Sequence, residues 1–143
     1  MSVALCGSFL LECLGGTHDF STDVIKAALF SEDASFDFDT TAYATTNEIA
    51  TGDGYTTGGA TLTLSSGYPQ LVSDKAAVRF EDQVWTFTAS RSVRWALIYN
   101  SSKSDRAILS IDFGNTRNVN GLFTLKFPLT APSPITFATA VVR

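Results

Sequence analysis

The stretch from Val93 to Phe113 constrains the fold more than any other part of the sequence. It contains two runs of β-branched and aromatic residues, V-R-W-A-L-I-Y and A-I-L-S-I-D-F, on either side of the polar segment N-S-S-K-S-D-R. Strand-forming runs that flank turn formers predict a β-hairpin. Side chains along a strand alternate between its two faces, and both faces of this hairpin are largely apolar. Because such a hairpin is not stable alone in water, other strands must cover it.

The composition supports a globular chain that can supply those strands. With 143 residues, of which 45% are hydrophobic and 12% aromatic, the chain can build one core, and we expect a single domain over 1–143. No apolar run reaches the roughly 18 residues that span a bilayer, so we expect no membrane partner. The formal net charge of −4 argues against a nucleic-acid partner, because nucleic-acid affinity depends on concentrated Lys and Arg.

Further strand patterns recur at close spacing. Val24–Phe30 is apolar on both faces and predicts an interior strand, whereas the alternating segment 60–65 predicts a strand with one wet face. The remaining strand patterns cover 75–81, 84–88, 122–127 and 135–142, and the segment G-N-T-R-N-V-N-G over 114–121 predicts a polar turn. About eight short strands predict a mainly β fold, an antiparallel β-sandwich or barrel-like domain with one short N-terminal helix.

The expected helix lies between Ser8, which can cap it, and Gly15-Gly16, which can end it. Its apolar positions at helical spacing are Phe9, Leu10, Cys13 and Leu14. Cys6 and Cys13 both fall in this segment. Seven residues of helix separate two Cα atoms by roughly 10 Å, beyond the roughly 7 Å that a disulfide can bridge. We therefore predict two free thiols.

Acidic side chains gather in the long polar connection from Ser31 to Thr51. In a short edge strand over Phe36–Phe38, Asp37 and Asp39 would point to one face about 7 Å apart. That separation suits a calcium site or the paired carboxylates of a glycosidase. Solvation of a surface loop is the simpler interpretation, and a tight turn likewise explains Asp53 in T-G-D-G-Y. We predict no catalytic residue, no metal ligand and no cofactor.

His18 is the only histidine, so a nucleophile–histidine–carboxylate site would have to form around T-H-D. Since no suitable nucleophile accompanies it, we interpret His18 as a surface-turn residue with local hydrogen bonds. Asn100-Ser101-Ser102 matches the glycosylation acceptor pattern, which matters only in a secretory route of a eukaryote.

Several aromatic residues suggest a sugar-binding platform on a sandwich face. They are Tyr55, Tyr68, Trp85, Trp95 and Tyr99. Trp95 alternates with Val93 and Leu97, however, which predicts that its ring lies in the core. Core packing is the favoured interpretation, and a carbohydrate-binding adhesion module stays as an alternative.

An ordered series of segments runs through most of the chain, roughly from Phe9 to Pro128. In order, they are D-V-I-K-A-A-L-F, T-T-A-Y-A-T-T-N-E, G-Y-T-T-G-G-A-T-L-T-L, V-W-T-F, W-A-L-I-Y-N-S-S-K-S-D-R-A-I-L-S-I-D-F-G and F-T-L-K-F-P. This series resembles a family of small β-rich virion proteins of tailed bacteriophages. The resemblance implies a non-enzymatic structural subunit, made in the host cytoplasm and located in the virion. Its partners would be the major capsid protein or tail proteins, with the chain present as a homo-oligomer or in many copies. Capsid decoration (a cement protein) is implied ahead of a tail- or fibre-associated adaptor.

The chain departs from the family pattern in two places. Arg94-Trp95 stands where family members often have a small residue and glycine. Family members usually end in an alternating strand, which Pro132 and Pro134 extend here. We expect such departures, and long connections ordered by partners, to contact neighbouring proteins. The predicted partner-contact residues are Phe36, Asp37, Phe38, Asp39, Arg94, Pro132 and Pro134.

Overall fold

The computed structural model describes residues 1–127 and the backbone of residues 135–138. Its elements are β1 (Ser2–Leu5), α1 (Gly7–Leu14), β2 (Ile25–Phe30), β3 (Ala60–Thr61), β4 (Gln70–Val72), β5 (Lys75–Val78), β6 (Gln83–Asn100), β7 (Arg106–Leu125) and β8 (Ile135–Ala138). Strands account for 50% of the residues and helix for 6%. Five strands form one sheet in the order β1-β7-β6-β2-β3, and β4-β5-β8 form a second sheet. All the strand pairs are antiparallel.

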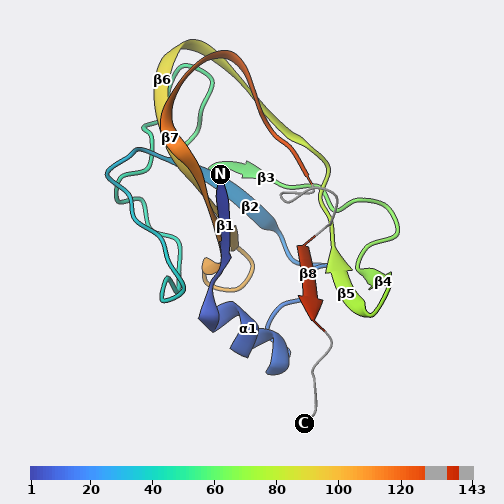
Figure 1. The fold of residues 1–143 in the computed structure, drawn as a ribbon. Coiled ribbons are helices and arrows are strands. Elements are labelled where there is room, and N and C mark those ends of the chain that lie inside the picture. Colours follow the sequence, from blue (N-terminus) through green and yellow to red (C-terminus); the bar gives the residue numbers. More distant parts are fainter. Residues whose placement is uncertain (128–134, 139–143) are drawn as a thin grey trace.

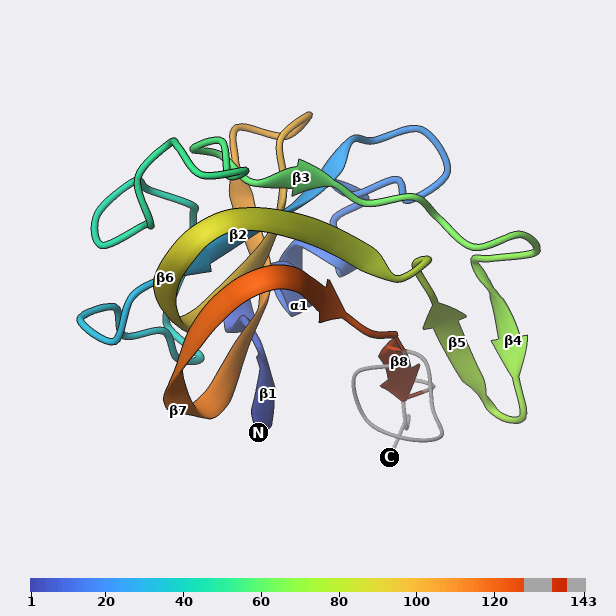
Figure 2. The same cartoon turned by 90° about the horizontal axis from the view of Figure 1, so that it is seen from above.

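The predicted fold class is confirmed: the chain is mainly β, antiparallel and sandwich-like, with one short helix. The barrel-like alternative is not realised, because the strands do not close on themselves. Figures 1 and 2 show the smaller sheet beside the ends of β6 and β7 that lie farthest from their connecting turn. In the part of the chain that the structure describes, no helix has the length and apolar character needed to cross a membrane.

The predicted hairpin forms and is longer than expected. β6 and β7 pair from Asn100↔Arg106 at the turn out to Gln83↔Leu125, and Figure 2 shows them arching together across the molecule. Three register shifts interrupt the pairing, between Phe87 and Arg91, between Val93 and Trp95 and between Ile98 and Tyr99. An extra residue in one strand bends it and increases its twist, so these irregularities explain the arch.

The polar turn predicted over 114–121 is wrong, because β7 continues through it. Asn118 and Val119 pair with Ser92 and Arg91 of β6. Residues 117–119 pair with 91–93 of β6, and this facing strand outweighs the local turn preference of glycine and asparagine. Gly114 and Gly121 still adopt positive φ, of 85° and 79°, as glycines do at bulges rather than at a chain reversal.

The predicted interior strand is also confirmed. β2 lies between β6 and β3, and all of its residues except Lys26 are buried. The strand predicted over 60–65 is shorter than expected: only Ala60–Thr61 pairs with β2, and Leu64 makes a single bridge to Phe80. The aromatic core around β2 and the hairpin includes Phe9, Phe30, Tyr55, Phe80 and Phe87.

The N-terminal segment contains a strand that the sequence pattern did not reveal. β1 pairs with β7 from Ser2↔Asp112 to Leu5↔Leu109, which makes it an edge strand of the larger sheet. The helix therefore begins at Gly7 after a Cys6 N-cap that makes no side-chain cap hydrogen bond, and the prediction that Ser8 caps it is wrong. The predicted end at Gly15-Gly16 is confirmed, since the Gly15 N–H donates to Leu11 O at 3.1 Å.

Candidate functional site

α1 has two apolar faces, and only one of them is covered. Phe9 is fully buried and Cys13 is half-buried, on the side that packs against the sheet. Leu10, Leu11 and Leu14 are 37%, 72% and 86% exposed. Residues spaced three, four and seven apart share one side of a helix, so these leucines lie with Gly7 on a face turned away from the core.

Phe38 extends this exposed face beyond the first turn of α1. The Gly7 N–H donates to the Phe38 carbonyl oxygen at 2.8 Å. A Cβ at position 7 would lie 2.4 Å from Cε1 and Cζ of Phe38, so the ring rests directly against the bare backbone of Gly7. Phe38 is nevertheless 62% exposed. We call Leu10, Leu11, Leu14 and Phe38 the apolar strip.

The four consecutive residues predicted to contact a partner, 36–39, differ in their exposure to solvent. Phe36 points inward, with its ring centroid 4.8 Å from Phe30 and 5.8 Å from Trp95. Asp37, Phe38 and Asp39 are exposed. Exposure leaves these three as candidate contact residues, whereas Phe36 is half-buried and packs against the core.

The edge strand predicted over Phe36–Phe38 does not form. The carboxylate of Asp37 accepts hydrogen bonds from the Asp39 N–H (3.0 Å) and the Thr40 hydroxyl (3.4 Å). An aspartate that bonds the backbone two residues ahead makes a turn, and this local bond competes with an extended strand. Asp37 therefore begins a turn, and Asp39 lies within it.

The connection from Ser31 to Thr51 is held by the chain itself, contrary to the expectation that partners order it. The Glu48 carboxylate accepts hydrogen bonds from the hydroxyls of Tyr43 (2.5 Å) and Tyr55 (2.7 Å) and from the Gly58 N–H (2.7 Å). Burial, together with the Glu48 carboxylate, raises the pKa of both tyrosines, so their hydroxyls stay protonated as donors. The connection is thus anchored around Glu48 by hydrogen bonds within the chain.

Arg94, another predicted contact residue, is committed to the hairpin. Its Nε and Nη2 donate to the two carboxylate oxygens of Asp112, at 3.1 and 3.2 Å, and its guanidinium lies 5.9 Å from the Trp95 ring centroid. These hydrogen bonds lower the pKa of Asp112. The side chain is still 34% exposed, so a partner could reach one side of it. Pro132 and Pro134 lie outside the described residues.

His18 lies in a buried polar network, so its predicted surface position is wrong. Its side chain is 0% exposed, and Nε2 lies 3.1 Å from Oε2 of Glu12. Nδ1 lies 2.9 Å from the amide nitrogen of Asn100, which is 82 residues away in sequence. The amide donates, so Nδ1 must accept and Nε2 carries the proton toward Glu12. Burial lowers the pKa of His18 below 6.5, against the opposing effect of Glu12.

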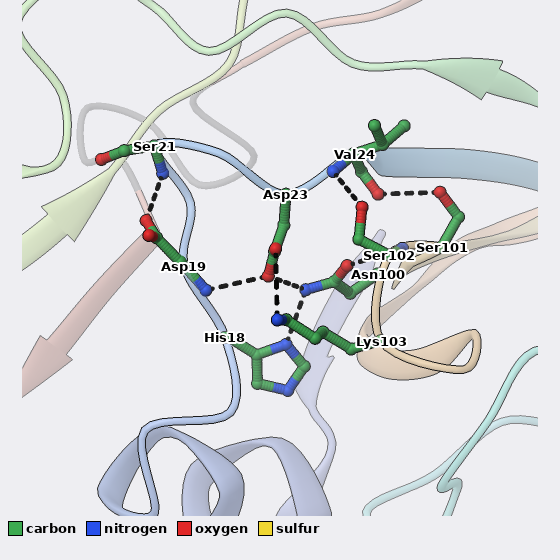
Figure 3. A network of polar contacts seen from close by, with 9 residues as sticks. All are labelled: His18, Asp19, Ser21, Asp23, Val24, Asn100, Ser101, Ser102 and Lys103. Atoms are coloured by element: carbon green, nitrogen blue, oxygen red, sulfur yellow. Dashed lines mark hydrogen bonds and ion pairs between the residues drawn. The ribbon is translucent and has the colours of Figure 1, made fainter.

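The second half of this network fixes the turn between β6 and β7 (Figure 3). The Asn100 amide also donates to Oδ2 of Asp23 at 2.7 Å, and Lys103 lies 3.7 Å from the same carboxylate. Burial alone would raise the pKa of Asp23, but hydrogen bonds from the Asp19 N–H and Asn100 and the charge of Lys103 lower it. Asn100 is fully buried, so the matching glycosylation pattern cannot serve as an acceptor site in the folded chain.

The groups considered for catalysis are engaged in contacts within the fold. His18 has no exposed surface from which to reach a substrate, and both its nitrogens are engaged. Asp53 pairs with Arg91 at 3.4 Å in a turn where its φ is 54°. Within residues 1–127 and 135–138, no group of three or more His, Cys, Asp or Glu could hold a metal ion.

The aromatic residues considered for a sugar platform are mostly buried. Tyr55 and Tyr99 are 2% exposed and Trp85 is 6% exposed, while Trp95 and Tyr68 are half-buried. Tyr99 stacks on Tyr43 with ring centroids 4.3 Å apart, and its hydroxyl donates to Gly58 O at 2.7 Å. Tyr55, Trp85 and Tyr99 thus pack inside the domain and offer no stacking surface to a sugar.

Two leucines of the apolar strip differ from the sequence prediction. Helical spacing groups Leu10 and Leu14 with Phe9 and Cys13, but the helix turns both leucines to solvent. The sequence of the helix does indicate that part of its apolar surface stays exposed. Apolar residues occupy most of the helix circumference, which is wider than the stripe that one covering sheet can bury.

Comparisons with known proteins found no relative of this chain. No family model matches the chain, and no match was found among curated proteins or solved structures.

Proposed function

We propose that this chain is a non-enzymatic structural protein of a tailed-bacteriophage virion. The ordered series of segments between Phe9 and Pro128 resembles such proteins. The antiparallel fold supports the proposal because it gives a rigid subunit that can be placed repeatedly on a particle.

The observation that carries the proposal is the exposed apolar strip. Three of its four side chains are more than 60% exposed, although they are as apolar as the core. Contiguous apolar surface on a soluble protein marks a contact with another molecule, because leaving it in water is unfavourable. A subunit that works by assembly needs such a surface and needs no catalytic groups.

Within this class, we place capsid decoration ahead of a tail- or fibre-associated adaptor. A cement subunit binds the outside of the particle in many copies, so weak individual contacts add up to durable attachment. The partner would be the major capsid protein in the first case and a tail protein in the second. The adhesion alternative loses support, because Tyr55, Trp85 and Tyr99 are buried and offer sugars no stacking surface.

The decisive measurement is the protein content of purified virions of the phage that encodes this chain. Quantitative mass spectrometry should find the chain in many copies per particle, and imaging of the particle should locate it on the capsid or tail. Abundant host proteins in the same preparation measure carry-over. If the chain is absent, or present at fewer than about one copy per particle, multi-copy assembly is excluded.

A paired substitution then tests whether the exposed surface matters. Phe38→Ser should leave a folded chain that is incorporated poorly, because the Phe38 ring is 62% exposed. Phe36→Ser should instead lower the stability, because the Phe36 ring packs against Phe30 and Trp95. If the folded Phe38→Ser chain is incorporated at the wild-type level, Phe38 is not a contact residue.

A further inference from the structure

The charges around the apolar strip indicate what kind of surface covers it. Asp37 and Asp39 are exposed on either side of Phe38 in the chain. They lie at the end of the strip where Phe38 meets Gly7. A partner that buries Phe38 must therefore come close to two carboxylates.

The two segments that build this surface provide no positive side chain. Residues 1–25 and 31–51 contain no lysine or arginine. Arg106 reaches α1 from β7, but its Nε lies 3.4 Å from Oε2 of Glu12. The Glu12 side chain is only 12% exposed and pairs with the buried His18, whereas Leu11 and Leu14 are exposed to solvent. The strip is thus an apolar surface with an acidic end.

A second copy of this chain is a poor occupant of the strip. In a two-fold contact each copy presents the same surface, so the segments carrying Asp37 and Asp39 would meet a surface that provides no positive side chain. Uncompensated carboxylates near a contact are unfavourable, and like charges brought together destabilise it. A different protein with positive side chains would instead gain from both features.

We propose that the apolar strip docks into an apolar groove on another virion protein, and that lysine or arginine side chains border this groove where it meets Asp37 and Asp39. This inference rests on the proposed function, of which it names the contact surface and the partner's chemistry. Eight residues of helix are only about 12 Å long, so one such contact is smaller than a standard stable interface. Attachment then depends on many copies and on further contacts.

The test uses particles purified from a phage that lacks the gene for this chain. Purified full-length chain is added at increasing concentration, and the amount that sediments with the particles gives the affinity. Leu11→Asp should weaken binding by about 10-fold or more, because it puts a charge at a position that the partner buries in the complex. Asp39→Lys should weaken binding as well, and added salt should weaken wild-type binding.

The matched control is Leu71→Asp on β4, where the leucine is 77% exposed, close to the 72% of Leu11. It should bind within about two-fold of wild type, because an exposed site outside the contact carries little binding energy. Circular dichroism and thermal melting should find all three variants folded, since each substituted side chain is exposed.

Each outcome separates this inference from the proposed function. If wild type binds the particles and Leu11→Asp binds equally well, the strip is not the contact, although the virion role stands. If Asp39→Lys binds as tightly as wild type or tighter, the partner's border is not positive and its proposed chemistry is wrong. If wild type forms a dimer in solution that Leu11→Asp abolishes, the occupant is a second copy. If wild type neither binds nor occurs in virions, the proposed function fails and this inference fails with it.

Discussion

Replacing Gly59 by alanine should destabilise the fold severely, because the backbone of β2 lies where the new methyl group would go. Gly59 immediately precedes β3 and has a φ of +77°. An ideal Cβ there would lie 1.9 Å from the carbonyl oxygen of Ala27 and 2.7 Å from the Cα of Ala28. Neither atom belongs to a flexible side chain, so β2 and β3 would have to separate.

The expected magnitude combines two terms. An L-residue in the left-handed region costs about 1–2 kcal/mol relative to glycine. Forcing a methyl group into a filled space adds about 1–3 kcal/mol, toward the upper end where backbone must move. We therefore expect Gly59→Ala to lower the free energy of unfolding by about 3–5 kcal/mol, a large part of the stability of a typical domain.

Gly67→Ala is the matched control, because Gly67 has a similar φ of +85° but no atom within 4 Å of an ideal Cβ. It should lose only the conformational term, about 1–2 kcal/mol. Urea unfolding of both variants, followed by tryptophan fluorescence and circular dichroism, measures the difference directly. The melting temperatures should differ by about 6 °C for a difference of about 2 kcal/mol. Equal losses in the two variants would refute the close approach of Gly59 to β2.

Three further predictions concern the core and the buried polar groups. Burial lowers the pKa of His18 below 6.5, so as the pH falls the unfolded chain binds the proton first, and the free energy of unfolding should decrease below about pH 6.5 by at most about 1.4 kcal/mol per pH unit. Urea unfolding at a series of pH values measures this slope, which His18→Gln should lack. Trp95→Ala should lower the free energy of unfolding by about 3 kcal/mol, because the ring is half-buried against Phe36, and an unchanged melting temperature would contradict this. Cys6 and Cys13 are free, and burial raises the pKa of both thiols to about 11, so alkylation should be slow in the native chain. After denaturation both thiols should be alkylated, and an intact mass that shows a disulfide would contradict the prediction of two free thiols.

The parts of the fold that were predicted correctly depend on patterns within one short segment. The alternation from Val93 to Phe113 specifies the hairpin, and the apolar run from Val24 to Phe30 specifies a strand buried on both faces. Gly15 and Gly16 end the helix by local geometry alone. Period and turn chemistry act over a few residues, so they can be inferred without knowing what packs nearby.

The features that only the tertiary structure decided depend on neighbours distant in sequence. Residues 114–121 have turn-forming composition, yet they are strand because β6 lies opposite them. His18 is buried because Asn100 and Glu12 together satisfy both its nitrogens, and no pattern around T-H-D encodes that pairing. The helix contains more apolar residues than the sheet can cover, and its orientation against β7 decides which of them reach water. The sequence shows which residue types are present. Burial and strand pairing, however, depend on the complete tertiary structure, in which long-range contacts outweigh the local preference of a segment for turn, strand or helix.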